Sequence, residues 1–208
     1  MYTPPHFKES DREALAHMVQ QHPFAVLVSF EKGLHATHIP LMLRVSAEGE
    51  WRLLGHVSKA NQQWHHFSEF QEVLAIFTGP HQFISSSWYE KTNVSTWNYQ
   101  AVHCYGTTRI LEEEEVKASL ENLTNTFEAG MRHPRLFEHL PKEMVEDHIR
   151  GIVAFEITVT RIEGQFKLSQ NRNPRDFHQI ISELNQMNDP EAHRLAAAMQ
   201  QHQNKSTD

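Results

Sequence analysis

Strand-like and helix-like segments follow one another in an order that few architectures can accommodate. Strand patterns dominate from Phe24 to Leu111, and another strand pattern returns after Gly151. Residues 112–150, between them, have a helical pattern. A parallel sheet would need strands that alternate with helices throughout. The observed order therefore favours a mainly β fold, in which an antiparallel barrel carries peripheral helices.

Turn signals separate the expected strands. Phe24–Phe30 reads as an apolar strand, residues 31–33 as a turn and residues 34–45 as the returning partner, where Pro40 indicates a sheet edge or a bulge. Further strands are predicted at 51–57, 73–77, 81–84, 102–111, 151–163 and 166–168. Gly79 and Pro80 indicate a break between the strands at 73–77 and 81–84, and Gly164 a turn between the last two.

Helices are predicted on both sides of this strand-rich region. Ser10 and Glu13 have the spacing of a capping box, which indicates a short amphipathic helix that ends before Pro23. The helix over 112–128 has acidic residues in its first turn and Gly130 just past its end. Other helices are predicted at 61–67, 141–150, 174–187 and 190–203.

Composition excludes several classes of function. The 208 residues carry a formal net charge of −7, and the densest basic stretch, 167–175, holds only three Lys or Arg residues, which argues against general binding to phosphate backbones. Cys104 is the only cysteine, so an intrachain disulfide and a thiolate-rich zinc site are excluded. The sixteen histidines are scattered and form no H-E-x-x-H motif, so no metal site is expected. The apolar runs have the length of strands and are too short to cross a membrane. Residues 1–20 contain no uninterrupted apolar run of the kind found in a secretion signal, so a cytoplasmic protein is expected.

Residues 77–106 combine aromatic surface with polar groups. Trp88, Tyr89, Trp97 and Tyr99 lie there among hydroxyl, amide and imidazole side chains. A flat conjugated ligand would suit this composition, because aromatic faces stack on it while polar groups fix its edges. A hairpin that packs on its own sheet or on a second subunit would account for the same residues without a ligand.

Residues 55–61, with the sequence GHVSKAN, join a predicted strand to a short helix. Free backbone N–H groups at the helix start, the Ser58 hydroxyl and the Lys59 ammonium could together hold a phosphate. Alternatively, Ser58 is an ordinary helix cap and Lys59 is solvated. The segment is neither a P-loop nor a dinucleotide fingerprint, since the required glycines are absent.

Two other segments place polar groups where the expected sheet could expose them. In the strand at 34–40, His35 and Thr37 lie on one face while Ala36 and His38 lie on the other. This arrangement fits either room for a ligand or the usual polarity of an edge strand. Residues 166–172, FKLSQNR, gather donors where the barrel-like region ends, and the alternative there is a turn whose polar groups satisfy one another.

Five segments, in this order along the chain, resemble the PaiB-type family of FMN-binding negative transcriptional regulators: ATHIP at 36–40, GHVSKANQQW at 55–64, VLAIFTGPHQFISSSWY at 73–89, STWNYQAVHCYG at 95–106 and FKLSQNR at 166–172. The initial MYTPPHF also fits this family. The resemblance implies FMN as cofactor and an antiparallel split β-barrel of the FMN-binding type. It also implies a homodimer with FMN near the interface.

The resemblance further implies domain limits and cofactor contacts. Residues 1–172 would form the FMN-binding split barrel with a helical insert at about 112–150, and residues 173–208 a C-terminal helical extension. Ser58, Lys59 and Asn61 would contact the phosphate. The other implied contacts are Thr37, His38, His56, Trp97, Asn98, His103, Gln170 and Arg172, some of them supplied by a second subunit.

The family implies a negative transcriptional regulator that binds DNA, although the sequence has no helix-turn-helix or basic stripe with which to read it. An FMN-dependent oxidoreductase of the flavin-reductase type is an alternative, in which the flavin carries electrons and the protein positions a substrate. A haem-handling split barrel is a third. No catalytic residue can be assigned, because no nucleophile elbow or other catalytic arrangement is present.

Overall fold

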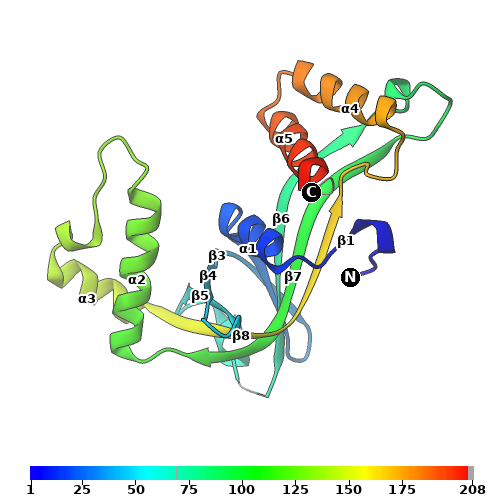
Figure 1. Cartoon of the computed structure of the whole chain (residues 1–208). Coiled ribbons are helices and arrows are strands. Elements are labelled where there is room, and N and C mark those ends of the chain that lie inside the picture. The colour runs from blue at the N-terminus through cyan, green and yellow to red at the C-terminus, as the bar shows by residue number, and fades with distance from the viewer. Residues whose placement is uncertain (69, 206–208) are drawn as a thin grey trace. The chain divides into compact units, whose positions relative to one another are not determined.

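The computed structural model describes residues 1–68 and 70–205 (Figure 1). Its strands are β1 (Lys8–Glu9), β2 (Phe24–Phe30), β3 (Leu34–Pro40), β4 (Met42–Val45), β5 (Trp51–Ser58), β6 (Glu72–Ile84), β7 (Thr96–Ile110) and β8 (Ile152–Lys167). Its α-helices are α1 (Arg12–Gln21), α2 (Glu113–Glu128), α3 (Lys142–Gly151), α4 (Pro174–Gln186) and α5 (Pro190–Lys205). Short 3-10 helices are η1 (Pro5–Phe7), η2 (Gln62–His66), η3 (Ser86–Trp88) and η4 (Phe137–His139).

The strands follow the order β3-β2-β6-β7-β8-β5-β4, and β1 pairs with β8. Antiparallel registers hold β1 to β8, β2 to β3 and β6, β4 to β5, and β5 to β8. The chain divides into two compact units. We call residues 23–76 and 104–162 the barrel unit, and residues 1–22, 77–103 and 163–208 the terminal unit. Strands β6, β7 and β8 each run through both units (Figure 1).

In the barrel unit the sheet curls back on itself without closing. β3 and β4 stand at opposite ends of the strand order, yet Leu41 alone separates them in the sequence. β3 and β5 therefore approach each other, and a Cβ atom on Gly55 would lie 3.3 Å from the carbonyl oxygen of Pro40. Fully buried side chains such as Leu53 and Phe155 fill the interior. The result is a split antiparallel barrel: the order of segments predicts the antiparallel barrel, and the family resemblance implies its split form.

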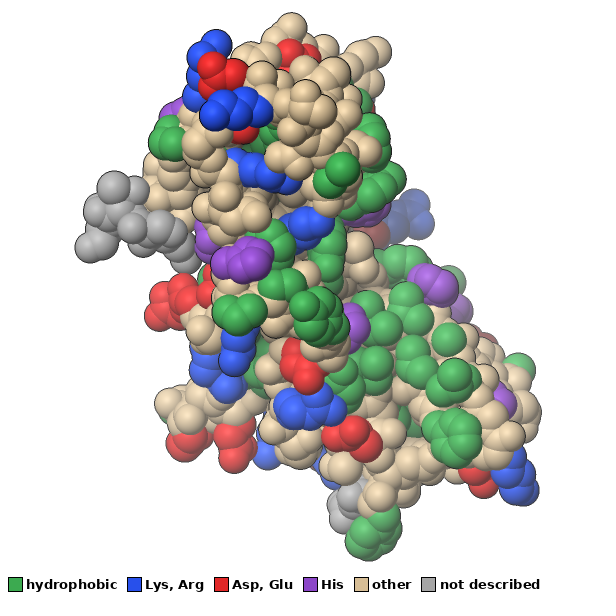
Figure 2. Space-filling view, turned by 90° about the vertical axis from the view of Figure 1, so that its right-hand side faces the viewer, with side chains coloured by type: hydrophobic (Ala, Val, Ile, Leu, Met, Phe, Trp, Pro, Cys, Tyr) green, Lys and Arg blue, Asp and Glu red, His purple; other side chains and the backbone are tan. Residues whose placement is uncertain are grey.

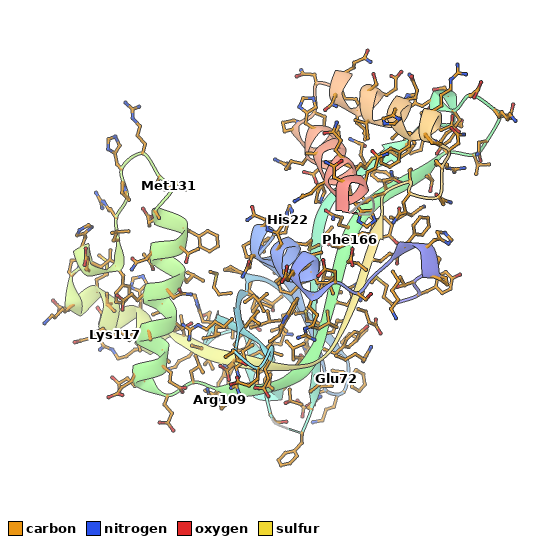
Figure 3. All side chains as sticks on the ribbon, viewed as in Figure 1. His22, Glu72, Arg109, Lys117, Met131 and Phe166 are labelled. Carbon is orange, nitrogen blue, oxygen red and sulfur yellow. The ribbon has the colours of Figure 1, made fainter. Side chains whose placement is uncertain are left out.

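An ionic cluster and a small apolar core anchor the α2 helix to the barrel. Arg109 on β7 donates to Glu115 in the first turn of α2 (2.8 Å) and to Glu156 (3.3 Å), which also accepts a bond from Arg52 (2.8 Å) (Figure 3). The bonds from Arg109 lower the pKa of Glu115 to about 2. Four buried apolar residues of β5, the β7–α2 connection, α2 and β8 also pack together: Leu54, Leu111, Val116 and Ala154.

In the terminal unit, glycine lets helix α1 approach the sheet. β1 pairs with the end of β8, where Glu9 lies opposite Gly164. A Cβ atom at position 164 would meet Leu15 of α1 at 2.2 Å and the Glu9 carbonyl oxygen at 3.0 Å. The sequence prediction of a turn at Gly164 is therefore wrong: the residue lacks a side chain because a helix and a strand pack against it.

Other sequence predictions need smaller corrections. β6 runs without interruption through residues 79 and 80, where the sequence predicted a break. Gly79 lacks a side chain because Met18 packs against it: a Cβ atom at position 79 would lie 3.2 Å from the Met18 Cε. β7 begins at Thr96, so the TWNY segment lies in a strand and not in a loop. Asp11, rather than Ser10, caps α1 by accepting a bond from the Glu13 N–H. The predicted helix at 61–67 is the 3-10 helix η2.

Other predicted elements agree with the structure. β2 matches its predicted bounds, β5 and α2 lie within one residue of theirs, and helices occur near 141–150, 174–187 and 190–203. The division of the chain at about residue 172 stays a prediction. Over the ranges that the structure describes, none of the helices has the length and apolar character that a membrane span needs.

Candidate functional site

The junction between β5 and η2 is built as a tight turn over residues 58–61. The Asn61 N–H donates to the Ser58 carbonyl (2.9 Å), and the Ala60 N–H donates to the Ser58 Oγ (3.2 Å). The Lys59 N–H donates to the Gly151 carbonyl (2.9 Å). These backbone donors, which the sequence suggested as free, are thus already paired. An anion at this junction would therefore have to be bound by side chains.

Lys59 is the side chain best placed for that purpose. It is exposed, and its ammonium has neither a hydrogen-bond nor an ion-pair partner among the described residues. Its backbone carbonyl accepts a bond from the Trp64 indole (3.0 Å), which fixes the turn on its η2 side. The Ser58 hydroxyl is also exposed beside it. The junction therefore presents one unpaired positive charge on a well-fixed backbone.

Thr37, Asn61 and Gln63 connect this junction to β3. The Thr37 hydroxyl donates to Gln63 Oε1 (2.6 Å) and accepts from Asn61 Nδ2 (2.9 Å). The Gln63 N–H donates to Asn61 Oδ1 (2.9 Å), which caps η2. Two residues predicted as cofactor contacts, Thr37 and Asn61, are thereby brought together across 24 positions of sequence.

A buried chain of polar groups continues from this network into the barrel. Gln63 Nε2 donates to the Leu27 carbonyl (3.1 Å) and to Ser29 Oγ (3.1 Å). Ser29 bonds to His66 Nδ1 (3.3 Å), and His66 Nε2 lies 3.0 Å from a carboxylate oxygen of Glu31. Gln63 and Ser29 are each 2% exposed. Sequence reasoning missed Gln63, Ser29 and His66, because their burial and pairing depend on how β2 meets η2.

The other two candidates in the barrel unit lie apart from this network. His38 points to the opposite face of β3 from Thr37, where it is exposed and its ring lies 6.1 Å from that of Phe24. His56 on β5 pairs with Ala154 of β8. It is half-buried, and burial lowers its pKa.

The remaining candidates belong to the terminal unit, and two of them are occupied by bonds within it. Asn98 is completely buried: its Nδ2 donates to Ser169 Oγ (2.8 Å), and its Oδ1 accepts from the same hydroxyl (3.1 Å). Gln170 Nε2 donates to the Phe166 carbonyl (2.6 Å), while its Oε1 accepts from the Leu168 N–H (2.8 Å). The side-chain amides of Asn98 and Gln170 are thus both hydrogen-bonded within the terminal unit.

The other candidates in this unit are Trp97, Arg172 and His103, and among them Trp97 is the most exposed. Trp97 is 52% exposed, and its ring stands 6.1 Å from that of Phe83 in an edge-to-face contact. The Arg172 guanidinium lies 4.6 Å above the ring of Tyr89. His103 is half-buried, and burial is the main cause that lowers its pKa. Exposed aromatic faces such as that of Trp97 are the groups that a flat ring system stacks on.

The terminal unit also contains a cavity of about 620 Å³. Residues of α1, α5 and the adjoining strands line it, including His17, His22, Phe166, Arg194 and His202 (Figure 3). No residue predicted to contact the cofactor lies among the described residues of its wall.

Comparisons with known proteins identify the family of this chain. The family described as "Putative FMN-binding domain" matches residues 1–161. "Protease synthase and sporulation protein PAI 2" of Bacillus subtilis (strain 168) is 38% identical over 201 residues, which cover 96% of this chain and 97% of that protein.

Two solved structures have a similar fold. The flavocytochrome Anf3 from Azotobacter vinelandii superposes with a TM-score of 0.62 at 17% identity, over 85% of this chain and 78% of that one. The FAD and heme binding protein from Mycobacterium smegmatis gives a TM-score of 0.59 at 16% identity, over 82% and 78% of the two chains.

Fold and family together define a split-barrel protein of the flavin-binding class. The chain belongs to the family of FMN-binding domains and is a homologue of PAI 2 over nearly its full length.

Proposed function

We propose that this protein binds FMN with the phosphate at the β5–η2 junction, and that it acts as a homodimeric negative regulator of transcription. The observation that carries the phosphate assignment is the unpaired, exposed ammonium of Lys59 beside Ser58 and Asn61. An FMN phosphate is an anion that accepts several hydrogen bonds. A lysine ammonium, a hydroxyl and an amide N–H suit it, since charge-assisted hydrogen bonds are about twice as strong as neutral ones.

Because the backbone N–H groups of residues 59–61 are paired, the phosphate would depend on these side chains. FMN, once bound, would supply a redox-active and light-absorbing ring. The protein's own residues would hold its phosphate at the junction.

Lysine removal tests the phosphate role. Lys59→Ala should weaken FMN binding roughly ten- to a hundredfold while leaving riboflavin binding nearly unchanged, because only FMN carries the phosphate. Titration monitored by flavin fluorescence gives both affinities. Lys117→Ala is the matched control, since Lys117 is an exposed lysine on α2 (Figure 3). Equal loss for the two flavins would contradict the phosphate role, and a colourless protein that does not bind added FMN would refute the cofactor.

The homodimer has support from exposed apolar residues on the β2–β3 hairpin. Phe24, Phe30 and Leu34 are 65%, 59% and 78% exposed, and Phe30 pairs directly with Leu34. Hydrophobic side chains also gather on one surface of the molecule (Figure 2). Such clusters are typical of protein interfaces. A monomer in light scattering at micromolar concentration would contradict the dimer.

The regulatory role has support from the homologue, whose name refers to protease synthesis and sporulation. We place this regulator in the cytoplasm, as the sequence predicts. With a net charge of −7, any DNA contact would need a local concentration of basic residues in the dimer. A gel-shift assay at low salt on the protein's own promoter region, with and without FMN, tests this role, and no shift in either state would remove direct repression.

A further inference from the structure

Gln63 is oriented by a backbone group whose polarity is fixed. The Leu27 carbonyl can only accept a hydrogen bond, so the Gln63 side-chain atom that lies 3.1 Å from it must be the amide nitrogen. The amide oxygen of Gln63 consequently faces Thr37 at 2.6 Å. An oxygen there can only accept, so Thr37 must donate its single hydroxyl hydrogen to it.

This orientation passes on to Asn61. Because the Thr37 hydrogen is committed to Gln63, the Asn61 atom 2.9 Å from Thr37 Oγ1 must be the amide nitrogen. An independent backbone group gives the same answer: the Gln63 N–H can only donate, and it meets the Asn61 oxygen at 2.9 Å. Two backbone groups at opposite ends of the network therefore require the same direction for every hydrogen bond between them.

The three side chains consequently differ in what they can offer a ligand. Gln63 is 2% exposed and both its amide hydrogens have acceptors. Thr37 has no hydrogen left, although its oxygen can accept one more bond, which does not serve a phosphate. Asn61 is half-buried and keeps one Nδ2 hydrogen that no bond within the network uses.

We propose that Asn61 Nδ2 is the donor of this network that contacts the ligand, and that Thr37 and Gln63 are positioning residues which act only through Asn61. The proposal rests on the proposed function in taking the acceptor to be a phosphate oxygen of FMN. It changes the role of Thr37, which the family resemblance placed against the flavin, to that of a support behind the contact.

A double-mutant cycle on FMN affinity tests the proposal. Asn61→Ala should weaken binding roughly ten- to a hundredfold, as expected for losing a hydrogen bond to a charged group. Thr37→Val, which keeps the shape but removes the hydroxyl, should weaken binding by about three- to tenfold. The double variant should bind no worse than Asn61→Ala alone, and Thr37→Ser should bind like the unaltered protein. Additive losses would show that Thr37 contacts the ligand itself and would overturn the proposal.

An NMR measurement on the protein without flavin separates this inference from the proposed function. The two side-chain amide protons of Asn61 should differ in the temperature dependence of their chemical shifts, because only one is bonded to Thr37. Thr37→Val should remove the difference, and urea unfolding verifies that the variant folds. Equal behaviour of both protons in the unaltered protein would overturn the assigned orientation. A protein that has this signature but never binds FMN would retain the orientation and lose the proposed function.

Discussion

Asn61 and Asn98 were predicted to contact the same cofactor, yet their surroundings leave them with different hydrogen-bonding capacity. Asn61, which caps η2, uses its oxygen and one amide hydrogen and is half-buried. Asn98, in β7, is completely buried, and both ends of its amide meet Ser169. The residue type is the same, but only Asn61 can still donate to a ligand from an accessible position.

Lys59 and Lys167 differ in the same way, since one is free to bind a ligand and the other already has a partner. The Lys59 ammonium is exposed and has no partner among the described residues, whereas Lys167 at the end of β8 donates to Thr96 and is half-buried. Burial, and then the charge of Arg172, lower the pKa of Lys167. A family position or a residue type does not identify a binding group by itself. What decides is whether the fold leaves the group's donors unused.

The Asn98→Ala variant tests most directly whether Asn98 stabilises the fold or contacts the cofactor. If Asn98 is structural, its removal leaves the buried Ser169 hydroxyl without its partner and should destabilise the protein by about 2–3 kcal/mol. Urea unfolding measures this loss. Asn185→Ala, at an exposed position of α4, is the control and should change stability by no more than about 0.5 kcal/mol. A variant that keeps its stability but loses FMN would instead support the cofactor contact that the sequence suggested.

Gln170→Ala should have a smaller effect of the same kind. The side chain closes the turn after β8 by bonding the Phe166 carbonyl and the Leu168 N–H, and it is only half-buried. We expect a loss of about 1 kcal/mol in urea unfolding, because water can replace part of these bonds. Gln200→Ala, on an exposed face of α5, serves as the control. A marked drop in FMN affinity without a change in stability would move Gln170 to the group of ligand contacts.

Much of the fold could be predicted from the sequence because hydrophobic alternation and turn residues are local signals. β2 follows from the apolar run Phe24–Phe30, and the turn after it from the polar residues that end at Gly33; α2 follows from its apolar spacing and acidic first turn. Gly79 and Gly164 were misread as turn signals. Each marks a place where another segment packs closely, at Met18 or Leu15, and the sequence does not reveal that contact.

The candidate site likewise contains residues that the sequence could predict and residues that it could not. The family resemblance implied that Thr37 and Asn61 contact the same cofactor, and the structure places these two side chains in hydrogen-bond contact. Gln63 lies inside the GHVSKANQQW segment, yet nothing in the sequence distinguishes it from Gln62, which is exposed. Its importance comes from the Leu27 carbonyl of a distant strand, and such a partner becomes known only when the strands are placed.

The smallest expected effect concerns His56, a predicted cofactor contact on β5 whose pKa is lowered from its ordinary value of 6.5 by burial. Since the folded state holds this proton less tightly than the unfolded state, its contribution to stability is complete above pH 6.5 and is lost as the pH falls from there through the folded pKa. His56→Gln removes that contribution. Between pH 7 and pH 5 the free energy of unfolding should therefore fall less steeply in the variant than in the unaltered protein, in urea titrations at each pH. The other histidines titrate in both proteins and cancel in the difference, so parallel profiles would mean that His56 is as well solvated in the folded chain as in the unfolded one.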